Sequence, residues 1–219
     1  MRLEALRHIA IEGPIGVGKS SLARRLAAHL GAGVLLERPE DNPFLERYYA
    51  DGSRFALQTQ LFFLFQRLEQ TRVLLEPGMF ERSVVSDFLF AKDALFASLT
   101  LSPDEHRLYT QVHAQVAPRL PEPDLVIWLR APPRLLQERI RGRGIAMEQG
   151  LTVDELSRLS DAYAEHFERH LGAPLLAVDT EAFHPVAREA DFASLLKRID
   201  AFSGPRESFH PGGSSLLGG

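Results

Sequence analysis

The chain contains no cysteine. It therefore has no disulfide bond and no zinc site with cysteine ligands, and because this composition fits a reducing compartment we expect a cytoplasmic protein. The sequence also lacks any apolar run of about 18 residues, the length that a membrane-spanning helix requires. Residues 1–7 carry charge without an apolar segment behind them, so we expect neither a membrane anchor nor a secretion signal.

A large excess of charge of one sign is also missing. The 25 basic and 29 acidic residues leave a net charge of −4, so we expect no nucleic-acid partner and no binding to an anionic membrane. Hydrophobic residues make up 45 % of the chain, which is enough for the buried core of one domain. We place that domain at residues 1–202 and expect a disordered tail at 203–219, which is rich in Gly and Ser.

One segment near the start of the chain has the pattern of a phosphate-binding loop. A short apolar strand at residues 9–11 runs into Gly13-x-x-x-x-Gly18-Lys19-Ser20, and leucines at helical spacing follow. Such glycines let backbone N–H groups surround the phosphates of ATP, the lysine reaches the β- and γ-phosphates, and the serine hydroxyl binds Mg²⁺. The alternative is a purely structural glycine turn. The predicted ATP-binding residues are Gly13, Pro14, Ile15, Gly16, Val17, Gly18, Lys19, Ser20 and Ser21.

Strand and helix signals alternate along the rest of the chain. Apolar runs at 34–37, 125–129 and 175–179 predict buried strands, and a further strand is expected to end at 79–82. Helical spacing and capping residues predict helices at about 19–30, 55–75, 102–120, 152–171 and 192–201. Ser83 is expected to cap one more helix, with Asp87 one turn in. This order predicts an α/β fold with about five parallel strands and helices on both faces.

Polar residues at the ends of the predicted strands are candidates for catalysis, because ligands bind at the carboxyl ends of parallel strands. Glu37 can accept the proton of an attacking hydroxyl group, Glu81 can hold Mg²⁺, and Arg82 can neutralise a transferring phosphoryl group. The alternatives are an exposed loop glutamate and a surface ion pair.

Two further groups are less specific. Arg139 and Arg143 share a helix face beside a glycine-flanked loop, which suits a mobile lid over phosphates at about residues 139–150. The alternative for these arginines is a solvated basic face. Three other polar residues lie on otherwise apolar predicted helices, where such residues are more often structural than functional: Gln60, Arg67 and Asp87.

Taken together, these motifs resemble the deoxynucleoside kinase family, in its bacterial branch for deoxyadenosine, deoxyguanosine and deoxycytidine. The resemblance covers residues 8–180 and depends most on two features, the Glu-Arg-Ser…Asp element at 81–87 and the Tyr-x₁₀-Gln-x₆-Arg spacing that begins at Tyr49. It implies a three-layer P-loop kinase fold, ATP and Mg²⁺ as cofactors, a deoxynucleoside as the small-molecule substrate, and a homodimer.

The resemblance also implies a role for each matching residue. Glu37 matches the general base for the 5′-hydroxyl, Arg82 the arginine at the transferring phosphate, and Glu81 the acid near Mg²⁺. The residues that match the sugar and base contacts are Tyr49 and Glu148 for the 3′-hydroxyl, and Gln60 and Asp87, with Arg67 beside them, for the base edge.

The expected base contacts suggest which substrates are preferred. Ionised Asp87 accepts hydrogen bonds and so favours an exocyclic amine, whereas Gln60 both donates and accepts. We therefore expect a purine deoxynucleoside or deoxycytidine rather than thymidine, in nucleotide salvage. The lid departs from the family pattern, because its usual Arg-Gly-Arg trio aligns here only if Glu148 is displaced. Arg139 and Arg143 are the expected phosphate contacts.

Two other functions are compatible with a phosphate-binding loop. A nucleoside monophosphate kinase needs extra cations for the acceptor phosphate rather than a general base, so Glu37 argues against it. A subunit that binds a nucleotide without turnover is disfavoured by the complete set of Lys19, Ser20, Glu37 and Arg82.

Overall fold

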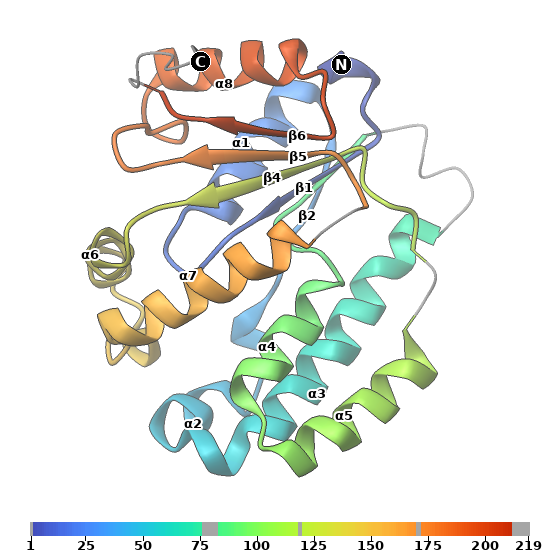
Figure 1. Ribbon diagram of the computed structural model, residues 1–219, viewed down its shortest axis with the longest axis vertical. Helices are drawn as coiled ribbons and strands as arrows, with labels where there is room; N and C mark the ends of the chain where they lie inside the picture. Colours follow the sequence, from blue (N-terminus) through green and yellow to red (C-terminus); the bar gives the residue numbers. More distant parts are fainter. Residues whose placement is uncertain (1, 76–82, 118–119, 170–171, 212–219) are drawn as a thin grey trace.

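The centre of the molecule is a parallel sheet of six strands in the order β2-β3-β1-β4-β5-β6. The structure is a computed structural model that describes residues 2–75, 83–117, 120–169 and 172–211 (Figure 1). The strands are β1 (His8–Glu12), β2 (Gly33–Leu35), β3 (Val84–Ser86), β4 (Leu125–Arg130), β5 (Leu175–Asp179) and β6 (Arg206–Phe209). Because β1 pairs with both β3 and β4, the loop that follows β1 lies at the middle of the sheet's carboxyl edge.

The helices connect these strands and confirm most of the expected ranges. The described α-helices are α1 (Lys19–Leu30), α2 (Leu45–Ala50), α3 (Gly52–Thr71), α4 (Lys92–Thr100), α5 (Pro103–Val116), α6 (Pro133–Arg143), α7 (Val153–Glu168) and α8 (Glu189–Ala201). Short 3₁₀ helices lie at Leu3–Ala5, Pro39–Asp41, Arg72–Leu75 and Ala146–Glu148. Within the described ranges, no helix combines the length and the apolar character that crossing a membrane would require.

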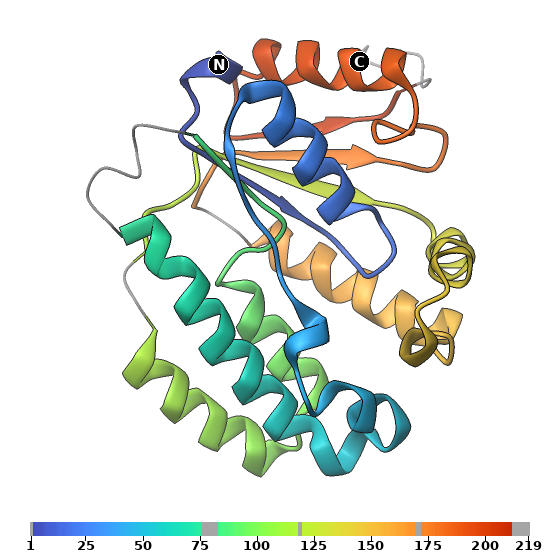
Figure 2. The same cartoon turned by 180° about the vertical axis from the view of Figure 1, so that it is seen from behind.

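The two faces of the sheet are buried by different helices. Along β4, Leu125, Ile127 and Leu129 belong to the core shared with α1, α6 and α8, whereas Val126 and Trp128 belong to the core shared with α4 and α7. Figure 1 shows α7 in front of the sheet, and Figure 2 shows α1 in front of the opposite face. Burial on both faces is the reason that β4 is a continuous apolar run in the sequence.

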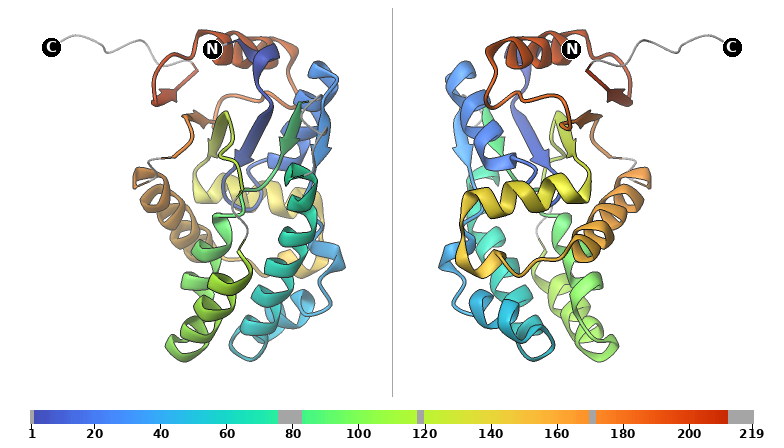
Figure 3. Two further views of the ribbon diagram at one scale, coloured as in Figure 1. Left: turned by 90° about the vertical axis from the view of Figure 1, so that its right-hand side faces the viewer. Right: turned by 90° about the vertical axis from the view of Figure 1, so that its left-hand side faces the viewer.

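A third group of helices extends beyond the sheet. Leu64 of α3, Ala97 of α4 and Tyr109 of α5 form a separate buried cluster, and these helices project away from the sheet in the side views of Figure 3. The short helix α2 packs against α3. This group supplies several of the charged side chains that face the loop after β1.

β6 corrects two expectations, the number of strands and the disordered tail. It pairs in parallel with β5, its Phe209 ring lies 5.4 Å from the Phe183 ring, and Glu207 forms an ion pair with Arg198. The sequence Arg-Glu-Ser-Phe contains a single apolar residue, so hydrophobic periodicity gives no signal for this edge strand. Residues 212–219 of the expected tail lie outside the described residues.

The segment after residue 82 also differs from expectation. Val84–Ser86 form β3 between β1 and β2, where the sequence predicts a helix capped by Ser83. All three residues are buried, and β-branched valines suit a buried strand. Instead of capping a helix, the Ser83 hydroxyl donates to Leu6 O at 2.6 Å. The expected strand end at 79–82 lies outside the described residues, and Asp87 consequently follows a strand directly.

Candidate functional site

Glycines shape the loop between β1 and α1. Gly13, Gly16 and Gly18 have φ angles of 142°, 84° and 102°, a region that residues with a Cβ rarely adopt. A Cβ on Gly13 would lie 2.4 Å from Leu129 O, and a Cβ on Gly16 would lie 2.8 Å from the Ile140 side chain. The loop therefore packs closely against β4 and α6 and leads directly into the amino end of α1, a geometry that binds anions.

The lysine of this loop lies at the first residue of α1. Its Nζ donates to Gly13 O at 2.9 Å and to Pro14 O at 3.2 Å. Burial, and after it the nearby charge of Lys92, lowers the pKa of Lys19 to about 8, although neighbouring carboxylates act in the opposite direction. The predicted ATP-binding residues 13–21 thus form one continuous unit, from the end of β1 into α1.

Asp87 connects this loop to the other half of the site. Its Oδ2 accepts a hydrogen bond from the Ser20 hydroxyl, and its Oδ1 accepts one from the Glu37 N–H at 2.7 Å. A hydroxyl beside a carboxylate provides oxygen ligands of the kind that Mg²⁺ prefers, so Ser20 and Asp87 fit the metal site that such a loop implies. The sequence pattern indicates Glu81 for this position; Glu81 and Arg82 lie outside the described residues.

Glu37 follows β2 and lies between two cations. Its Oε1 accepts a hydrogen bond from Arg67 Nε at 3.0 Å, and its Oε2 accepts one from Lys92 Nζ at 3.2 Å. Burial by itself raises the pKa of Glu37, but the charges of Arg67 and Lys92 hold that pKa well below its usual range. Glu37 is therefore ionised at neutral pH, which is the state that a proton acceptor needs.

Arg67 joins Glu37 to a second carboxylate. Arg67 Nη1 donates to Asp93 Oδ1, and the Tyr109 hydroxyl donates to Asp93 Oδ2. All three side chains of this Arg67–Asp93–Tyr109 network are buried, and burial raises the pKa of Tyr109 to about 12, so its hydroxyl stays a donor. The carboxylate paired with Arg67 is Asp93, whereas Asp87 follows β3 and accepts from Ser20 of the phosphate-binding loop; the base-edge role expected of Asp87 stays a prediction.

The other expected substrate contacts lie on α2, α3 and the loop after α6. Gln60 is 3 % exposed on α3, and in the part of the chain that the structure describes its Oε1 has no hydrogen-bond partner. A buried acceptor without a partner is costly, which fits a group that binds a ligand. Burial raises the pKa of Tyr49, and the charge of Glu148 raises it further. The helix that carries Tyr49, α2, contacts the 3₁₀ helix Ala146–Glu148, and the joint binding of a sugar hydroxyl by Tyr49 and Glu148 remains a prediction.

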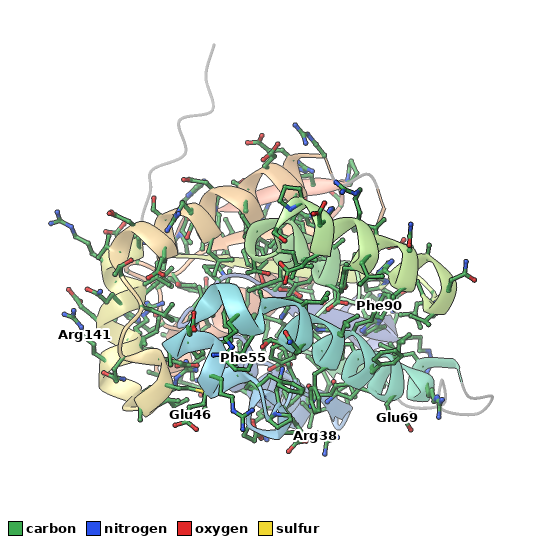
Figure 4. The ribbon with its side chains drawn as sticks, turned by 90° about the horizontal axis from the view of Figure 1, so that it is seen from below. Arg38, Glu46, Phe55, Glu69, Phe90 and Arg141 are labelled. Carbon is green, nitrogen blue, oxygen red and sulfur yellow. The ribbon has the colours of Figure 1, made fainter. Side chains whose placement is uncertain are left out.

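The arginines of the expected lid have different surroundings. Arg139 donates to Thr180 Oγ1 at 3.0 Å and to Thr180 O at 2.6 Å, and Arg143 at the end of α6 forms an ion pair with Glu148. Arg141 is exposed and projects from α6 (Figure 4). Since α6 packs against Gly16, Arg139 and Arg143 belong to a helix that borders the loop. Their contact with phosphates and the mobility of residues 139–150 remain predictions.

No sequence motif identifies three charged residues of the site, Glu12, Lys92 and Asp93. Glu12 is fully buried, and its carboxylate accepts hydrogen bonds from Gly13 N at 3.1 Å, Leu89 N at 2.6 Å and the Tyr163 hydroxyl at 3.0 Å. One signal could have found all three, because each interrupts or ends an otherwise apolar run. A charge buried in an apolar segment needs a partner, so such a residue is a candidate member of an ion-pair or hydrogen-bond network.

Comparison with known proteins agrees with this geometry. The family model described as deoxynucleoside kinase matches residues 9–203. The deoxyguanosine kinase of Bacillus subtilis (strain 168) is 31 % identical over 199 residues, which cover 87 % of this chain and 95 % of the relative. The deoxyadenosine/deoxycytidine kinase of the same organism is 28 % identical over 197 residues, or 87 % of this chain and 90 % of the relative.

A solved structure shows the same fold. It is that of deoxyadenosine kinase from M. mycoides, with the products dCMP and a flexible dCDP bound. Its TM-score is 0.75 at 22 % sequence identity, and the match covers 89 % of this chain and 98 % of the other. The three-layer P-loop kinase fold is therefore confirmed, with one strand more than expected.

Proposed function

The chain belongs to the deoxynucleoside kinase family, and we propose that it transfers the γ-phosphate of ATP to the 5′-hydroxyl of a purine deoxynucleoside or deoxycytidine, in preference to thymidine. The observation that carries this proposal is the position of Glu37. Its backbone N–H donates to Asp87 of the phosphate-binding side, and its ionised carboxylate is bound to Arg67, which in turn holds Asp93. A proton acceptor thus stands between a site for a triphosphate and a site for an uncharged acceptor.

On the donor side, residues 13–21 hold the phosphates of ATP, with Lys19 at the β- and γ-phosphates. Ser20 and Asp87 hold Mg²⁺, which when bound supplies positive charge to the phosphates. Arg139 and Arg143 of the lid, and Arg82, add further positive charge around the transferring group. These assignments are supported by the hydrogen bond between Ser20 and Asp87 and by the packing of α6 on Gly16.

On the acceptor side, Glu37 takes the proton of the 5′-hydroxyl as its oxygen attacks the γ-phosphorus. Tyr49 and Glu148 bind the 3′-hydroxyl of the sugar, supported by the contact between α2 and the 3₁₀ helix Ala146–Glu148. Gln60 and Arg67 face the base edge, and we transfer to Asp93 the base-contact role that the sequence pattern gives to Asp87. Ionised Asp93 only accepts hydrogen bonds and so favours an exocyclic amine, which adenine, guanine and cytosine carry and thymine lacks.

A nucleoside monophosphate kinase is a weaker candidate for this site. The acceptor half carries the carboxylates of Glu37 and Asp93 against the guanidinium of Arg67. Arg67 is therefore already paired with two carboxylates, whereas a monophosphate kinase needs further cations to hold the acceptor phosphate.

The proposal is tested by assaying deoxynucleosides and their monophosphates side by side with ATP, using the wild type, Glu37→Gln and Glu40→Gln. We expect deoxynucleosides to be phosphorylated and Glu37→Gln to lose about 10²–10⁴-fold in kcat while still binding ATP, the usual contribution of a general base. Glu40 is exposed three residues further on, so Glu40→Gln should retain full activity. Full activity of Glu37→Gln would remove the proposed base, and preference for monophosphates would favour the other candidate.

We also propose that the protein is a homodimer and acts in the cytoplasm, where ATP is available. Support for a dimer comes from large apolar side chains at the surface, Phe65 of α3 at 52 % and Leu108 of α5 at 48 % exposure, since such residues are favoured in interfaces. Sedimentation of the purified chain tests the oligomeric state, and a monomer at micromolar concentration would contradict it.

A further inference from the structure

Lys92 is a buried cation that none of these roles uses. It begins α4, and its side chain is 4 % exposed. Its Nζ lies 3.2 Å from Glu37 Oε2 and 3.9 Å from Glu12 Oε1, and 5.6 Å from the centre of the Phe96 ring. A buried ammonium group persists only with such partners. Lys92 is thereby held at the point where Glu37 approaches the phosphate-binding loop.

Lys92 also lies close to the lysine of that loop. Lys92 Nζ lies 3.9 Å from Glu12 Oε1, the other oxygen of Glu12 accepts from Gly13 N at 3.1 Å, and Lys19 Nζ donates to Gly13 O at 2.9 Å. Two neighbouring ammonium groups repel each other, and an anion that contacts both relieves this repulsion. Lys19 reaches the β- and γ-phosphates from the donor side, whereas Lys92 contacts Glu37 on the acceptor side. The anion that both lysines can contact is therefore the phosphoryl group in transit.

The other described cations near the site have different surroundings from those of Lys92. Arg67 is bound to Glu37 and Asp93, and the arginines of α6 pair with Thr180 and Glu148. The three residues directly after Asp87 supply no further cation, because Phe88, Leu89 and Phe90 are all uncharged. Among the described residues, Lys92 is thus the cation that contacts the proposed general base without also holding a base-contact residue.

We propose that Lys92 is a further catalytic residue, which contacts the transferring phosphoryl group. The proposal rests on the function proposed above. In that step the bond between O5′ and the γ-phosphorus forms, the bond from that phosphorus to the β–γ bridging oxygen breaks, and the electron pair leaves on ADP. The hydroxyl proton goes to Glu37, and Lys92 keeps its own proton throughout. Because Glu37 loses its negative charge on taking up the proton, its hold on Lys92 weakens as the phosphoryl group arrives.

The test compares Lys92→Met and Lys92→Arg with the wild type, using the deoxynucleoside that the wild type phosphorylates fastest. Lys197→Met, at an exposed position of α8, is the matched control and should keep wild-type kinetics. We expect Lys92→Met to lower kcat about 10²–10³-fold, the usual effect of removing one electrostatic contact to a transition state. The KM values for ATP and nucleoside should change less than about threefold, and Lys92→Arg should recover part of the lost kcat.

A second readout separates catalysis from folding. ADP, magnesium and fluoroaluminate, which together imitate the transferring phosphoryl group, are added with the deoxynucleoside, and binding is measured by calorimetry. Lys92→Met should bind ADP as the wild type does but lose the additional stabilisation by fluoroaluminate. If Lys92→Met does not fold, Lys92→Gln, which keeps a donor toward Glu37 without the charge, is measured in its place.

The possible failures point to different conclusions. A folded Lys92→Met or Lys92→Gln with kcat within about threefold of the wild type would overturn the catalytic role. So would a rise in KM with unchanged kcat, because that pattern indicates an interaction made equally in the ground state and the transition state. If the wild type itself phosphorylates none of the deoxynucleosides, it is the proposed function that fails.

Discussion

The donor and acceptor halves of the site are built in different ways. The donor half is one continuous segment, residues 13–21, shaped by backbone angles and by close contact with β4 and α6. The proposed acceptor half takes Glu37 from the segment after β2, Gln60 and Arg67 from α3 and Asp93 from α4, and it is held by ion pairs and a tyrosine hydroxyl. A backbone-built site is sensitive to added atoms, whereas a side-chain network is sensitive to lost charges. We therefore expect an added methyl group to impair ATP binding by the donor half alone, and a lost charge to impair nucleoside binding by the acceptor half alone.

The largest effect is expected from an added methyl group in the donor half. Gly16→Ala places a Cβ 2.9 Å from Leu136 O at a φ of 84°, so the loop must shift. A displacement of this size should weaken ATP binding about 10²-fold while deoxynucleoside binding is retained. Calorimetry with each ligand measures both. The control is Gly204→Ala before β6, where the nearest atom to an added Cβ is at 3.5 Å, an ordinary contact; unchanged ATP affinity in Gly16→Ala would contradict the backbone account.

A smaller effect with the opposite selectivity is expected in the acceptor half. Asp93→Asn removes the charge that Arg67 faces, and breaking a buried pair should lower the free energy of unfolding by about 3–5 kcal/mol. The kcat/KM for the deoxynucleoside should fall at least about tenfold, with ATP affinity unchanged. Tyr109→Phe deletes one hydrogen bond to the same carboxylate and should cost about 1 kcal/mol. Denaturant unfolding and steady-state kinetics measure these changes, and weakened ATP binding in Asp93→Asn would show that the halves are not separable.

The smallest effect concerns pH. The pKa of Lys19 is about 8, below the ordinary lysine value of 10.5, so the loop loses this charge as pH rises through 8. The kcat/KM for ATP should be level below about pH 7 and about tenfold lower at pH 9. The kcat/KM for the nucleoside at saturating ATP should stay level from pH 7 to 9, because the pKa of Glu37 lies far below that range. Two parallel profiles would contradict the assignment to Lys19.

Sequence patterns predict the donor half well because its information is local. Its functional residues, the glycines with Lys19 and Ser20, follow one another along the chain. The apolar runs of β1, β4 and β5 predict the strands of the sheet that holds this loop. The same reasoning reaches Glu37, Gln60 and Arg67, since each lies on a helix or next to a strand whose period is clear.

Local sequence patterns do not determine which side chains meet in the acceptor half. Asp87 and Asp93 are carboxylates in the same apolar segment, and which of them faces Ser20 depends on where a three-residue strand begins. Strands this short have little intrinsic preference and are positioned by the neighbouring strands with which they pair. The pairing of Arg67 with Asp93, the position of Lys92 beside Glu37 and the polar edge strand β6 all have this origin.

The double contact of Asp87 has a thermodynamic consequence. One carboxylate oxygen faces Ser20 and the other faces the backbone of Glu37, so a ligand that repositions Asp87 from either side changes the partner available to the other. We therefore expect ATP and the deoxynucleoside to alter each other's dissociation constants, and linkage requires both factors to be equal. Through Asp87, the affinity for the deoxynucleoside would therefore depend on whether ATP is bound.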